Sequence, residues 1–311
     1  MEYITLKNSD IKVSRLCMGG CPMGGYGWGD VQETALIEAV NTAVEKGINF
    51  FDTADTYGLG QSEITLSKAL GNKRKDVIIA SKFGVRRINN KTVYDNSSEW
   101  INEALEGSLK RLNTDYIDLY QVHYRDDKTP ISIVIDALEQ QKKKGRIRAY
   151  GLSNIHEQDI PELLEYKGKF VSFQDEYSLA CRKNESDMFD LADKLAMTPL
   201  TWGSLGQGIL TGKYDKNTVF GADDRRSRDI YVNFHGEKLL KNLEIVEVLK
   251  QIAENHNKSV SSVAIRFILD YLPDSAVLVG IKNKGQIVGN MEAIGWNLDS
   301  DEINELLKIS E

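Results

Sequence analysis

The sequence predicts an α/β fold, a single (β/α)8 TIM barrel over residues 1–311 with a short N-terminal β-hairpin and extra helices near the C-terminus. Apolar runs of strand length alternate with amphipathic helical stretches, a pattern typical of parallel strands covered by helices. Eight strand-like runs occur in a chain of 311 residues, and no linker divides them into two groups. One closed barrel is therefore favoured over an open sheet.

The expected strands are short apolar runs, and the helices between them place apolar residues on one face. Ala35, Ala39 and Ala43 mark that face in the first helix, which ends in Lys46 and Gly47, a cation followed by a glycine. The strands are expected at 15–19, 48–52, 77–82, 117–122, 147–151, 170–174, 198–202 and 276–279. The helices are expected at 34–46, 62–70, 98–112, 130–143, 160–166, 187–195, 239–255, 260–271, 286–293 and 300–307.

Two further segments complete the predicted architecture. Residues 3–6 and 11–13, separated by Asn-Ser-Asp, predict a small hairpin over the N-terminal end of the barrel. Residues 203 to about 236 form a long irregular excursion after the seventh strand, with a charged run at 223–228. Because long loops on barrels are usually functional, this excursion is expected to have a role in function.

Composition and charge exclude several classes of protein. An apolar fraction of 41%, a charged fraction of 27% and a net charge of −7 are typical of a soluble globular protein and argue against nucleic acid as a partner. The N-terminus has no signal-peptide layout and no apolar run could span a bilayer, so a cytoplasmic protein without a membrane partner is expected. Cys17, Cys21 and Cys181 are expected to be reduced thiols, and the histidines are scattered singly, so no metal is expected. A homo-oligomer is compatible with the sequence.

The most informative feature is a set of polar residues at the ends of consecutive strands. Asp52 and Tyr57 follow the second strand, Lys82 ends the third and His123 follows the fourth. In a barrel these positions meet at the C-terminal rim, where barrel active sites lie. Each residue alone has an ordinary interpretation, Asp52 as a cap, Lys82 as a side chain reaching water and His123 as a hydrogen-bonded rim residue. Their occurrence together favours a catalytic cluster.

Proton transfer to a carbonyl requires side chains of these types. Lys82 beside Tyr57 would favour the phenolate and lower the tyrosine pKa towards neutrality, while Asp52 would orient the lysine. Tyr57 could then act as a general acid in reduction and a general base in oxidation, with His123 hydrogen-bonded to the substrate oxygen. None of these groups donates hydride, so a reduced cofactor is required.

The later strand ends offer groups that fit such a cofactor. Ser153, Asn154 and Gln174 supply hydroxyl and amide groups for a carboxamide, and Trp202 either stacks on a ring or fills the core. The backbone of the 203–208 loop, Gly-Ser-Leu-Gly-Gln-Gly, could approach a pyrophosphate. Lys282 and Lys284 precede a helix, a position suited to a phosphate, although Lys284 fits a solvated surface charge equally well.

With these residues assembled, the chain resembles the aldo-keto reductase superfamily over nearly its whole length. The resemblance rests on Phe-Asp-Thr-Ala-x-x-Tyr-Gly at 51–58, Ser-Lys at 81–82, Val-His at 122–123, Gly-Leu-Ser-Asn at 151–154, and residues 280–290. It implies a (β/α)8 barrel that binds NADPH, or less favourably NADH, extended across the rim.

The resemblance also assigns roles to particular residues. The implied catalytic residues are Asp52, Tyr57, Lys82 and His123. The implied cofactor-binding residues are Gly20, Asp52, Ser153, Asn154, Gln174, Trp202, Gly203, Ser204, Leu205, Gly206, Gly208, Lys213, Arg226, Gly280, Lys282, Gln286 and Asn290. The implied substrate-binding residues are Trp28, Tyr57, His123 and Tyr124, with Tyr26, Phe83 and Arg125 also expected at the pocket edge.

Three positions depart from the pattern of that family. Gly-Gly-Cys at 19–21 stands for Gly-Thr-Trp, Gly-Ser-Leu at 203–205 stands for Ser-Pro-Leu, and Gly289 stands for an acid. The first departure bears on substrate size, and the other two bear on cofactor affinity and on the preference for NADPH. The cationic Lys282 still favours the 2′-phosphate of NADPH.

The leading hypothesis is an NADPH-dependent oxidoreductase that interconverts an aldehyde or ketone, sugar-like substrates included, and an alcohol. The long excursion and Trp202 are similar to the branch that contains sugar dehydrogenases and potassium-channel β subunits. The alternative is therefore a nicotinamide-nucleotide-binding regulatory subunit with little turnover. A metal-dependent barrel hydrolase is disfavoured, because the sequence shows no ligand cluster.

Overall fold

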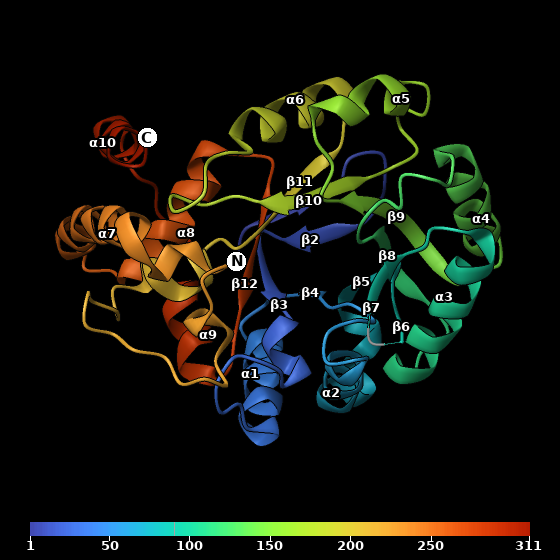
Figure 1. The fold of residues 1–311 in the computed structure, drawn as a ribbon, viewed down its shortest axis with the longest axis horizontal. Helices are drawn as coiled ribbons and strands as arrows, with labels where there is room; N and C mark the ends of the chain where they lie inside the picture. The colour runs from blue at the N-terminus through green and yellow to red at the C-terminus, as the bar shows by residue number, and fades with distance from the viewer. Residues whose placement is uncertain (90) are drawn as a thin grey trace.

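The computed structural model describes residues 1–89 and 91–311, and within them eight parallel strands form a closed barrel (Figure 1). Each strand is hydrogen-bonded to the barrel strands before and after it in the sequence, and the last pairs with the first. The barrel strands are β3 (Leu16–Gly19), β4 (Phe50–Asp52), β5 (Ile78–Phe83), β8 (Ile117–Val122), β9 (Ile147–Ser153), β10 (Ser172–Glu176), β11 (Thr198–Trp202) and β12 (Ala276–Gly280). The predicted fold class is confirmed.

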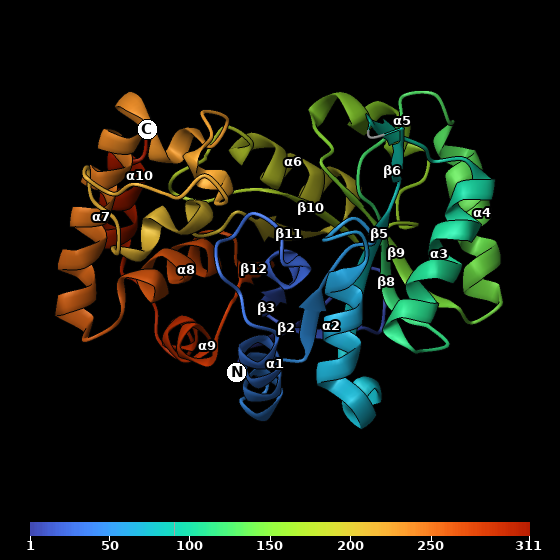
Figure 2. The same ribbon diagram turned by 60° about the horizontal axis from the view of Figure 1, so that its bottom comes forward.

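The helices surround the barrel, and the two views in Figures 1 and 2 show α7 and α10 packed together at one side of the molecule. These are the extra helices predicted near the C-terminus. The helices are α1 (Glu33–Glu45), α2 (Gln61–Leu70), α3 (Ser98–Leu112), α4 (Ile131–Lys143), α5 (Ile160–Leu164), α6 (Glu185–Leu195), α7 (Gly236–His256), α8 (Val260–Tyr271), α9 (Lys284–Met291) and α10 (Ser300–Ile309). The 203–236 excursion holds three short 3-10 segments, η4 (Gly206–Thr211), η5 (Arg225–Ser227) and η6 (Val232–Phe234).

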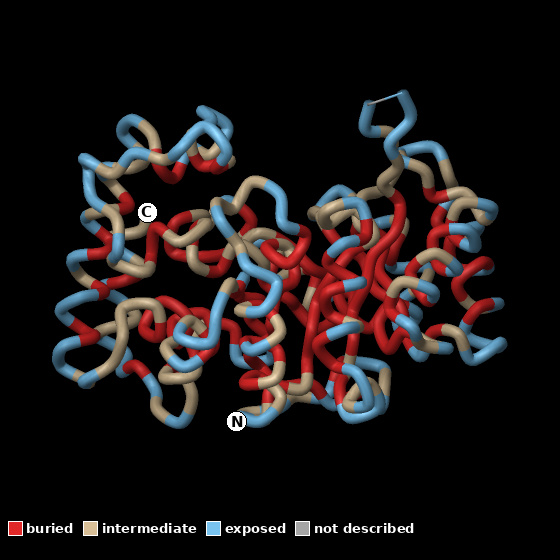
Figure 3. Tube along the Cα trace, turned by 90° about the horizontal axis from the view of Figure 1, so that it is seen from below, coloured by how far each residue is buried: buried red, intermediate tan, exposed pale blue. Residues whose placement is uncertain are grey.

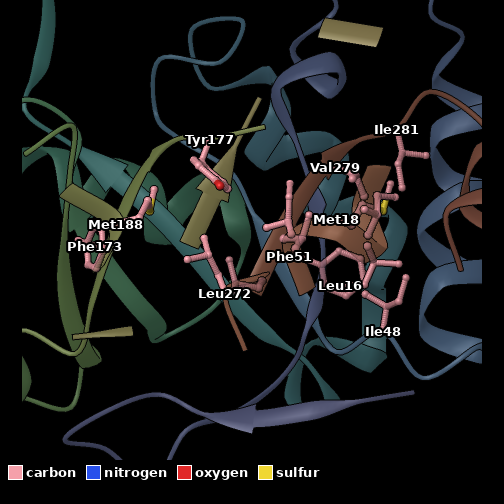
Figure 4. Packing of buried hydrophobic residues seen from close by; sticks show 14 of the residues in the cluster. Leu16, Met18, Ile48, Phe51, Phe173, Tyr177, Met188, Leu272, Val279 and Ile281 are labelled. Carbon is pink, nitrogen blue, oxygen red and sulfur yellow. The ribbon is translucent and has the colours of Figure 1, made fainter. Parts of the chain in front are cut away.

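Side chains of the barrel strands alternate between two apolar layers. Phe50 and Ala80 belong to a cluster inside the barrel, whereas Phe51 and Ile79 belong to the larger cluster between strands and helices. Figure 3 shows the buried strands at the centre of the molecule, and Figure 4 shows Phe51 close to Met18, its partner on the neighbouring strand. At the C-terminal end of the strands this alternation determines which polar side chains point into the barrel. Nowhere in residues 1–89 and 91–311 is there a helix long and apolar enough to cross a membrane.

The structure contains one predicted hairpin and one that was not predicted. β1 (Tyr3–Thr5) and β2 (Lys12–Ser14) pair antiparallel, and the neighbouring Leu6 and Ile11 are buried in the interior cluster, as expected for a hairpin over the barrel end. β6 (Val85–Ile88) and β7 (Lys91–Tyr94) form a second antiparallel pair. Its strands, Val-Arg-Arg-Ile and Lys-Thr-Val-Tyr, have four residues each and are too short to show the alternating apolar pattern that identifies a strand.

The bounds of β3, β4, β5, β9, β10 and β12 differ from the prediction by one or two residues, and two of these differences have a clear structural reason. β4 begins at Phe50 and not at residue 48, because Asn49 binds the N-terminal hairpin: the Ser14 amide donates to Asn49 Oδ1 (2.6 Å) and Asn49 Nδ2 donates to the Lys12 carbonyl (3.0 Å). β10 covers 172–176 and not 170–174, because its last residues continue the ladder with β11. The shift in β10 brings two more acidic residues into the strand.

Candidate active site

A cavity of about 740 Å³ opens at the C-terminal ends of the barrel strands. This volume lies in the range of small-molecule sites, about 300–1,000 Å³. Of the predicted site residues, all line the cavity except Lys82, Ser153 and Gly206, which are buried behind it. The structure thus brings the predicted residues together and divides them between the cavity wall and its support.

One end of the cavity contains what we call the tyrosine cluster: Asp52, Tyr57, Lys82 and His123. Asp52 and Lys82 point into the barrel from adjacent strands, and the Lys82 ammonium donates to Asp52 Oδ1 at 2.6 Å. Lys82 Nζ also lies 3.4 Å from the Tyr57 hydroxyl and 5.0 Å from the centre of its ring. Lys82 and Asp52 have side-chain exposures of 1% and 3%, so this ion pair is shielded from water.

The electrostatics of Tyr57 differ from the prediction. Burial, followed by the neighbouring Asp52 carboxylate, raises the pKa of the Tyr57 phenol well above its usual value. The prediction that Lys82 brings this pKa towards neutrality does not hold, because the phenol is buried and because the Asp52 carboxylate, 2.6 Å from the ammonium against 3.4 Å for the phenol, offsets the lysine charge. Tyr57 is therefore a protonated phenol that faces the cavity.

His123 faces the same cavity beside Tyr57. Their rings meet edge to face with centroids 5.8 Å apart, and Asn154 Nδ2 donates to the His123 carbonyl at 2.9 Å. Burial, and then the Lys82 ammonium, lower the pKa of His123 well below its usual value. The imidazole is therefore neutral at physiological pH, with Nδ1 buried and without a hydrogen-bond partner among the described residues.

The predicted carboxamide ligands have different surroundings. Asn154 and Gln174 line the cavity, but Gln174 Nε2 already donates to Asp52 Oδ2 at 2.9 Å. Gln174 thus fixes the second oxygen of Asp52, a role that the sequence did not reveal. Ser153 is 1% exposed and its hydroxyl finds no partner among the described residues, so it is a buried polar atom available to a ligand that reaches it.

The end of β11 and the 203–208 loop that follows it line the cavity. Trp202 is partly exposed and lines the cavity, so the alternative of a core tryptophan does not hold. Gly203, Gly206 and Gly208 have φ values of 66, 54 and 107°, the left-handed region that favours glycine. At Gly206 a Cβ would come within 2.8 Å of the Ala180 side chain, so the loop is also tightly packed.

The far end of the cavity is positively charged, and we call Lys213, Arg226 and Lys282 the cationic end. Arg226 is held in a double hydrogen bond by Asp224, with Nη2 to Oδ2 at 2.6 Å and Nε to Oδ1 at 2.9 Å. Lys282 forms no ion pair among the described residues and donates to the Trp28 carbonyl. Burial, and then Arg226, lower the pKa of Lys282, while Asp224 opposes them. Gln286 and Asn290 on α9 complete this wall.

The structure corrects three expectations about the pocket edge. Arg125 does not line the cavity, because it pairs with Asp159 (2.8 Å) and Glu162 (2.7 Å). Phe83 is fully buried in the outer apolar layer, and Tyr26 is 60% exposed outside the cavity wall.

The sequence also missed several lining residues. Cys21 was identifiable as the neighbour of Gly20, and Ser259 as the N-cap of a helix, α8. The missed residues are Gly19, Cys21, Pro22, Gln207, Thr211, Tyr214, Arg225, Tyr231, Ser259, Ser261, Leu278, Val279, Asn283, Gly285 and Gly289.

A barrel whose rim cavity is lined by these residues fits a reductase, and comparison with known proteins identifies the family. The model of the aldo/keto reductase family matches residues 15–311, so the chain belongs to this family of oxidoreductases. The family binds nicotinamide cofactors and acts on small-molecule carbonyl compounds.

Three curated relatives span nearly the whole chain. Aldo-keto reductase YhdN of Bacillus subtilis is 35% identical, over 100% of this chain and 94% of its own length. The NADH-specific methylglyoxal reductase of Escherichia coli is 29% identical over 100% and 99%, and a probable voltage-gated potassium channel subunit beta of Oryza sativa subsp. japonica is 33% identical over 94% and 91%. The solved structure of the glycerol dehydrogenase of Gluconobacter oxydans superposes with a TM-score of 0.89 at 32% identity, covering 99% and 94%.

The cavity residues fit a nicotinamide dinucleotide. At the end that holds the tyrosine cluster, the buried Ser153 hydroxyl has no hydrogen-bond partner among the described residues, and the neighbouring Asn154 amide bonds to His123. At the other end Lys282, which forms no ion pair within residues 1–89 and 91–311, lies just before the helix α9. A polar ring with a carboxamide suits the first end, and phosphate groups suit the second.

Proposed function

We propose that this protein is an NADPH-dependent oxidoreductase that interconverts an aldehyde or ketone, sugar-like compounds included, and an alcohol in the cytoplasm. The observation that carries the proposal is the tyrosine cluster: a protonated phenol at 3.4 Å from an ammonium group, beside a neutral imidazole, facing one cavity. We also infer that residues 1–311 form one domain.

In carbonyl reduction, Tyr57 donates the proton. When bound, the reduced nicotinamide supplies the hydride. As hydride reaches the carbonyl carbon, the carbonyl oxygen develops the charge of an alkoxide, a far stronger base than a phenolate. Transfer of the Tyr57 proton to that oxygen is therefore favourable even though the tyrosine pKa is raised.

The other three residues of the tyrosine cluster stabilise the charge that develops during the reaction and hold one another in position. Lys82 Nζ lies close to the Tyr57 oxygen, so the phenolate that remains after proton transfer would be stabilised by the ammonium group. Asp52 holds Lys82 in place, and Gln174 holds Asp52. His123, as a neutral imidazole, can donate a hydrogen bond to the substrate oxygen without competing as an acid.

The preference for NADPH rests on Lys282. Its ammonium group is not neutralised by a carboxylate among the described residues and lines the cationic end, so it can pair with a 2′-phosphate. The Escherichia coli relative is NADH-specific by name, so the preference of this protein needs its own test.

The test is a panel of aldehydes, ketones and aldoses assayed with NADPH and with NADH at the nicotinamide absorbance. We expect oxidation of NADPH that depends on the carbonyl compound, and a lower KM for NADPH than for NADH. Tight nucleotide binding without turnover of any carbonyl or alcohol would favour a regulatory subunit instead. The similarity to a potassium channel subunit beta supports this alternative.

A further inference from the structure

Three side chains of the kinds that bind metal ions meet on the outer side of the barrel. His156 follows β9, Asp175 lies in β10 and Asp187 lies in the first turn of α6. One ligand atom from each lies within 4.8 Å of the other two. None of the three is among the described residues that line the cavity, so this cluster is separate from the candidate active site.

The alternation of side chains in β10 produces this cluster. Gln174 points into the barrel and bonds to Asp52, so the next residue, Asp175, points outward to the helical layer. There it meets His156, whose backbone amide is held by Asp159 Oδ2 at 2.9 Å, and Asp187 at the start of α6. Three separate elements therefore converge on one point.

Each carboxylate has one oxygen committed to the fold. Asp175 Oδ1 accepts from the Glu176 amide (2.7 Å) and from Asn184 Nδ2 (3.1 Å), and Asp187 Oδ1 accepts from the Glu157 amide (3.1 Å). The two remaining Oδ2 atoms both approach the imidazole. His156 Nδ1 lies 2.9 Å from Asp187 Oδ2 and 3.4 Å from Asp175 Oδ2.

The imidazole nitrogen carries one proton at most, so it can satisfy only one of these oxygens. The hydrogen bond goes to Asp187, and Asp175 Oδ2 is left buried without a partner in a residue that is 2% exposed. A buried carboxylate oxygen without a donor is unfavourable, and it points towards the other two ligand atoms. This orphaned atom is the observation that indicates a bound cation.

We propose that His156 Nδ1, Asp175 Oδ2 and Asp187 Oδ2 bind one divalent transition-metal ion of the zinc type, with water in the fourth position. Imidazole favours such ions over Mg²⁺ and Ca²⁺. A tetrahedral ion with bonds of about 2.0–2.1 Å places its ligands ~3.3 Å apart. The present separations of 2.9 and 3.4 Å about the imidazole nitrogen are close to this value, and the two Oδ2 atoms lie within 4.8 Å of each other.

Charge and access also suit a divalent ion. Two carboxylates and a neutral imidazole balance the charge of the ion, and the Nδ1 proton is lost or moves to Nε2 when the metal binds. The His156 side chain is 38% exposed, which leaves an entry path from solvent. The ion would tie the segment after β9 and the strand β10 to α6, so its role is structural and lies outside the hydride-transfer reaction.

The test is isothermal titration of the chelator-treated, dialysed protein with ZnCl2 at pH 7.5, with CoCl2 absorption as a second readout. We expect one equivalent of Zn²⁺ to bind and the melting temperature to rise. Asp175→Asn and His156→Gln should each weaken that binding by more than about 100-fold, beyond the 10–100-fold typical of groups that only orient a ligand.

The matched control is His256→Gln. His256 Nε2 also bonds a carboxylate, Glu302 Oε1, at 2.7 Å, but no third ligand atom joins that pair among the described residues. This variant should keep the full equivalent of Zn²⁺ and the tetrahedral Co²⁺ spectrum. Unchanged Zn²⁺ stoichiometry and affinity in His156→Gln, a partly exposed position that tolerates change, would overturn the proposal. So would the absence of any Zn²⁺ binding by the wild-type protein.

Discussion

The two ends of the rim cavity differ in how their charges are balanced. In the tyrosine cluster every charge is matched and buried, since Lys82 pairs with Asp52, whose second oxygen accepts from Gln174. At the cationic end, Lys282 has no carboxylate partner among the described residues. Buried, matched charges keep a proton donor in place without attracting ions, whereas an unmatched cation attracts an anionic group. The difference implies that turnover and cofactor binding depend on different ends.

The fold explains why the ends differ. The tyrosine cluster is supplied largely by inward-pointing residues of adjacent barrel strands, where desolvation is greatest. The cationic end is supplied by the 203–236 excursion, where Arg226 is buried against Asp224, and by the segment before α9, where Lys282 stays partly exposed. Substitutions at each end should therefore separate kcat from the dissociation constant of the cofactor.

The largest expected effect is at Tyr57. In Tyr57→Phe the ring remains but the proton donor is lost, so kcat should fall by at least 10²–10⁴-fold while NADPH binding is retained. Stopped-flow turnover and fluorescence titration of NADPH measure the two quantities. A variant that turned over at a near-normal rate would remove Tyr57 from the proposed mechanism.

The second effect concerns the stability of the buried ion pair. Lys82→Met leaves the Asp52 carboxylate buried with only amide donors, and removal of one partner of a buried pair destabilises by about 3–5 kcal/mol. Urea denaturation of the variant measures the loss. The double variant Asp52→Asn/Lys82→Met should recover part of the stability and none of the turnover. Equal stability of single variant and wild type would contradict a tight ion pair.

The third effect lies at the cationic end. Lys282→Ala should raise the dissociation constant of NADPH by about tenfold, the weaker part of the range for a charged hydrogen bond, because Lys282 is only half-buried. The dissociation constant of NADH and kcat at saturating NADPH should stay nearly unchanged. Lys284→Ala is the control, since Lys284 is exposed, outside the cavity wall and 3.3 Å from Glu38. Equal losses of affinity for NADPH and for NADH would show that Lys282 does not bind the 2′-phosphate.

The sequence was sufficient for the barrel and for the position of the tyrosine cluster. Strands such as 276–280, Ala-Val-Leu-Val-Gly, are continuous apolar runs, and polar residues at the C-terminal ends of the strands must share one rim in a parallel barrel. The direction of the strands alone brings these residues to one rim, whichever way their side chains point. It placed Asp52, Tyr57 and His123 at the cavity correctly.

What the sequence could not give depends on distances between elements. The bond from Gln174 to Asp52 joins side chains 122 residues apart, and it requires the exact register of the strands between them. The raised pKa of Tyr57 follows first from burial and then from the neighbouring Asp52 carboxylate, and both depend on how closely the elements pack around the phenol. The cluster of His156, Asp175 and Asp187 stayed hidden because the prediction ended β10 at residue 174.

The smallest expected effect sharpens the comparison, because Asp55 lies beside the tyrosine cluster and its Oδ1 has no hydrogen-bond partner in the described part of the chain. Burial, and then Glu63, raise the pKa of Asp55 to about 8 from an ordinary value of 3.8. The folded state thus binds this proton more tightly than the unfolded state. Its contribution to stability is fully present below about pH 4 and is lost as the pH rises through 8.

Asp55→Asn keeps the neutral form at every pH, so the variant should match the wild type near pH 4 and exceed it at pH 8.5 by at least about 1 kcal/mol, the lower value for an unpaired buried polar group. Urea midpoints at both pH values measure the difference. Asp274→Asn is the control, since that side chain is 70% exposed and should leave the slope unchanged. If wild type and Asp55→Asn lost stability in parallel, Asp55 would be ionised in the folded protein. The region around Tyr57 would then be better solvated than its geometry indicates, and the contrast between the two ends of the cavity would weaken.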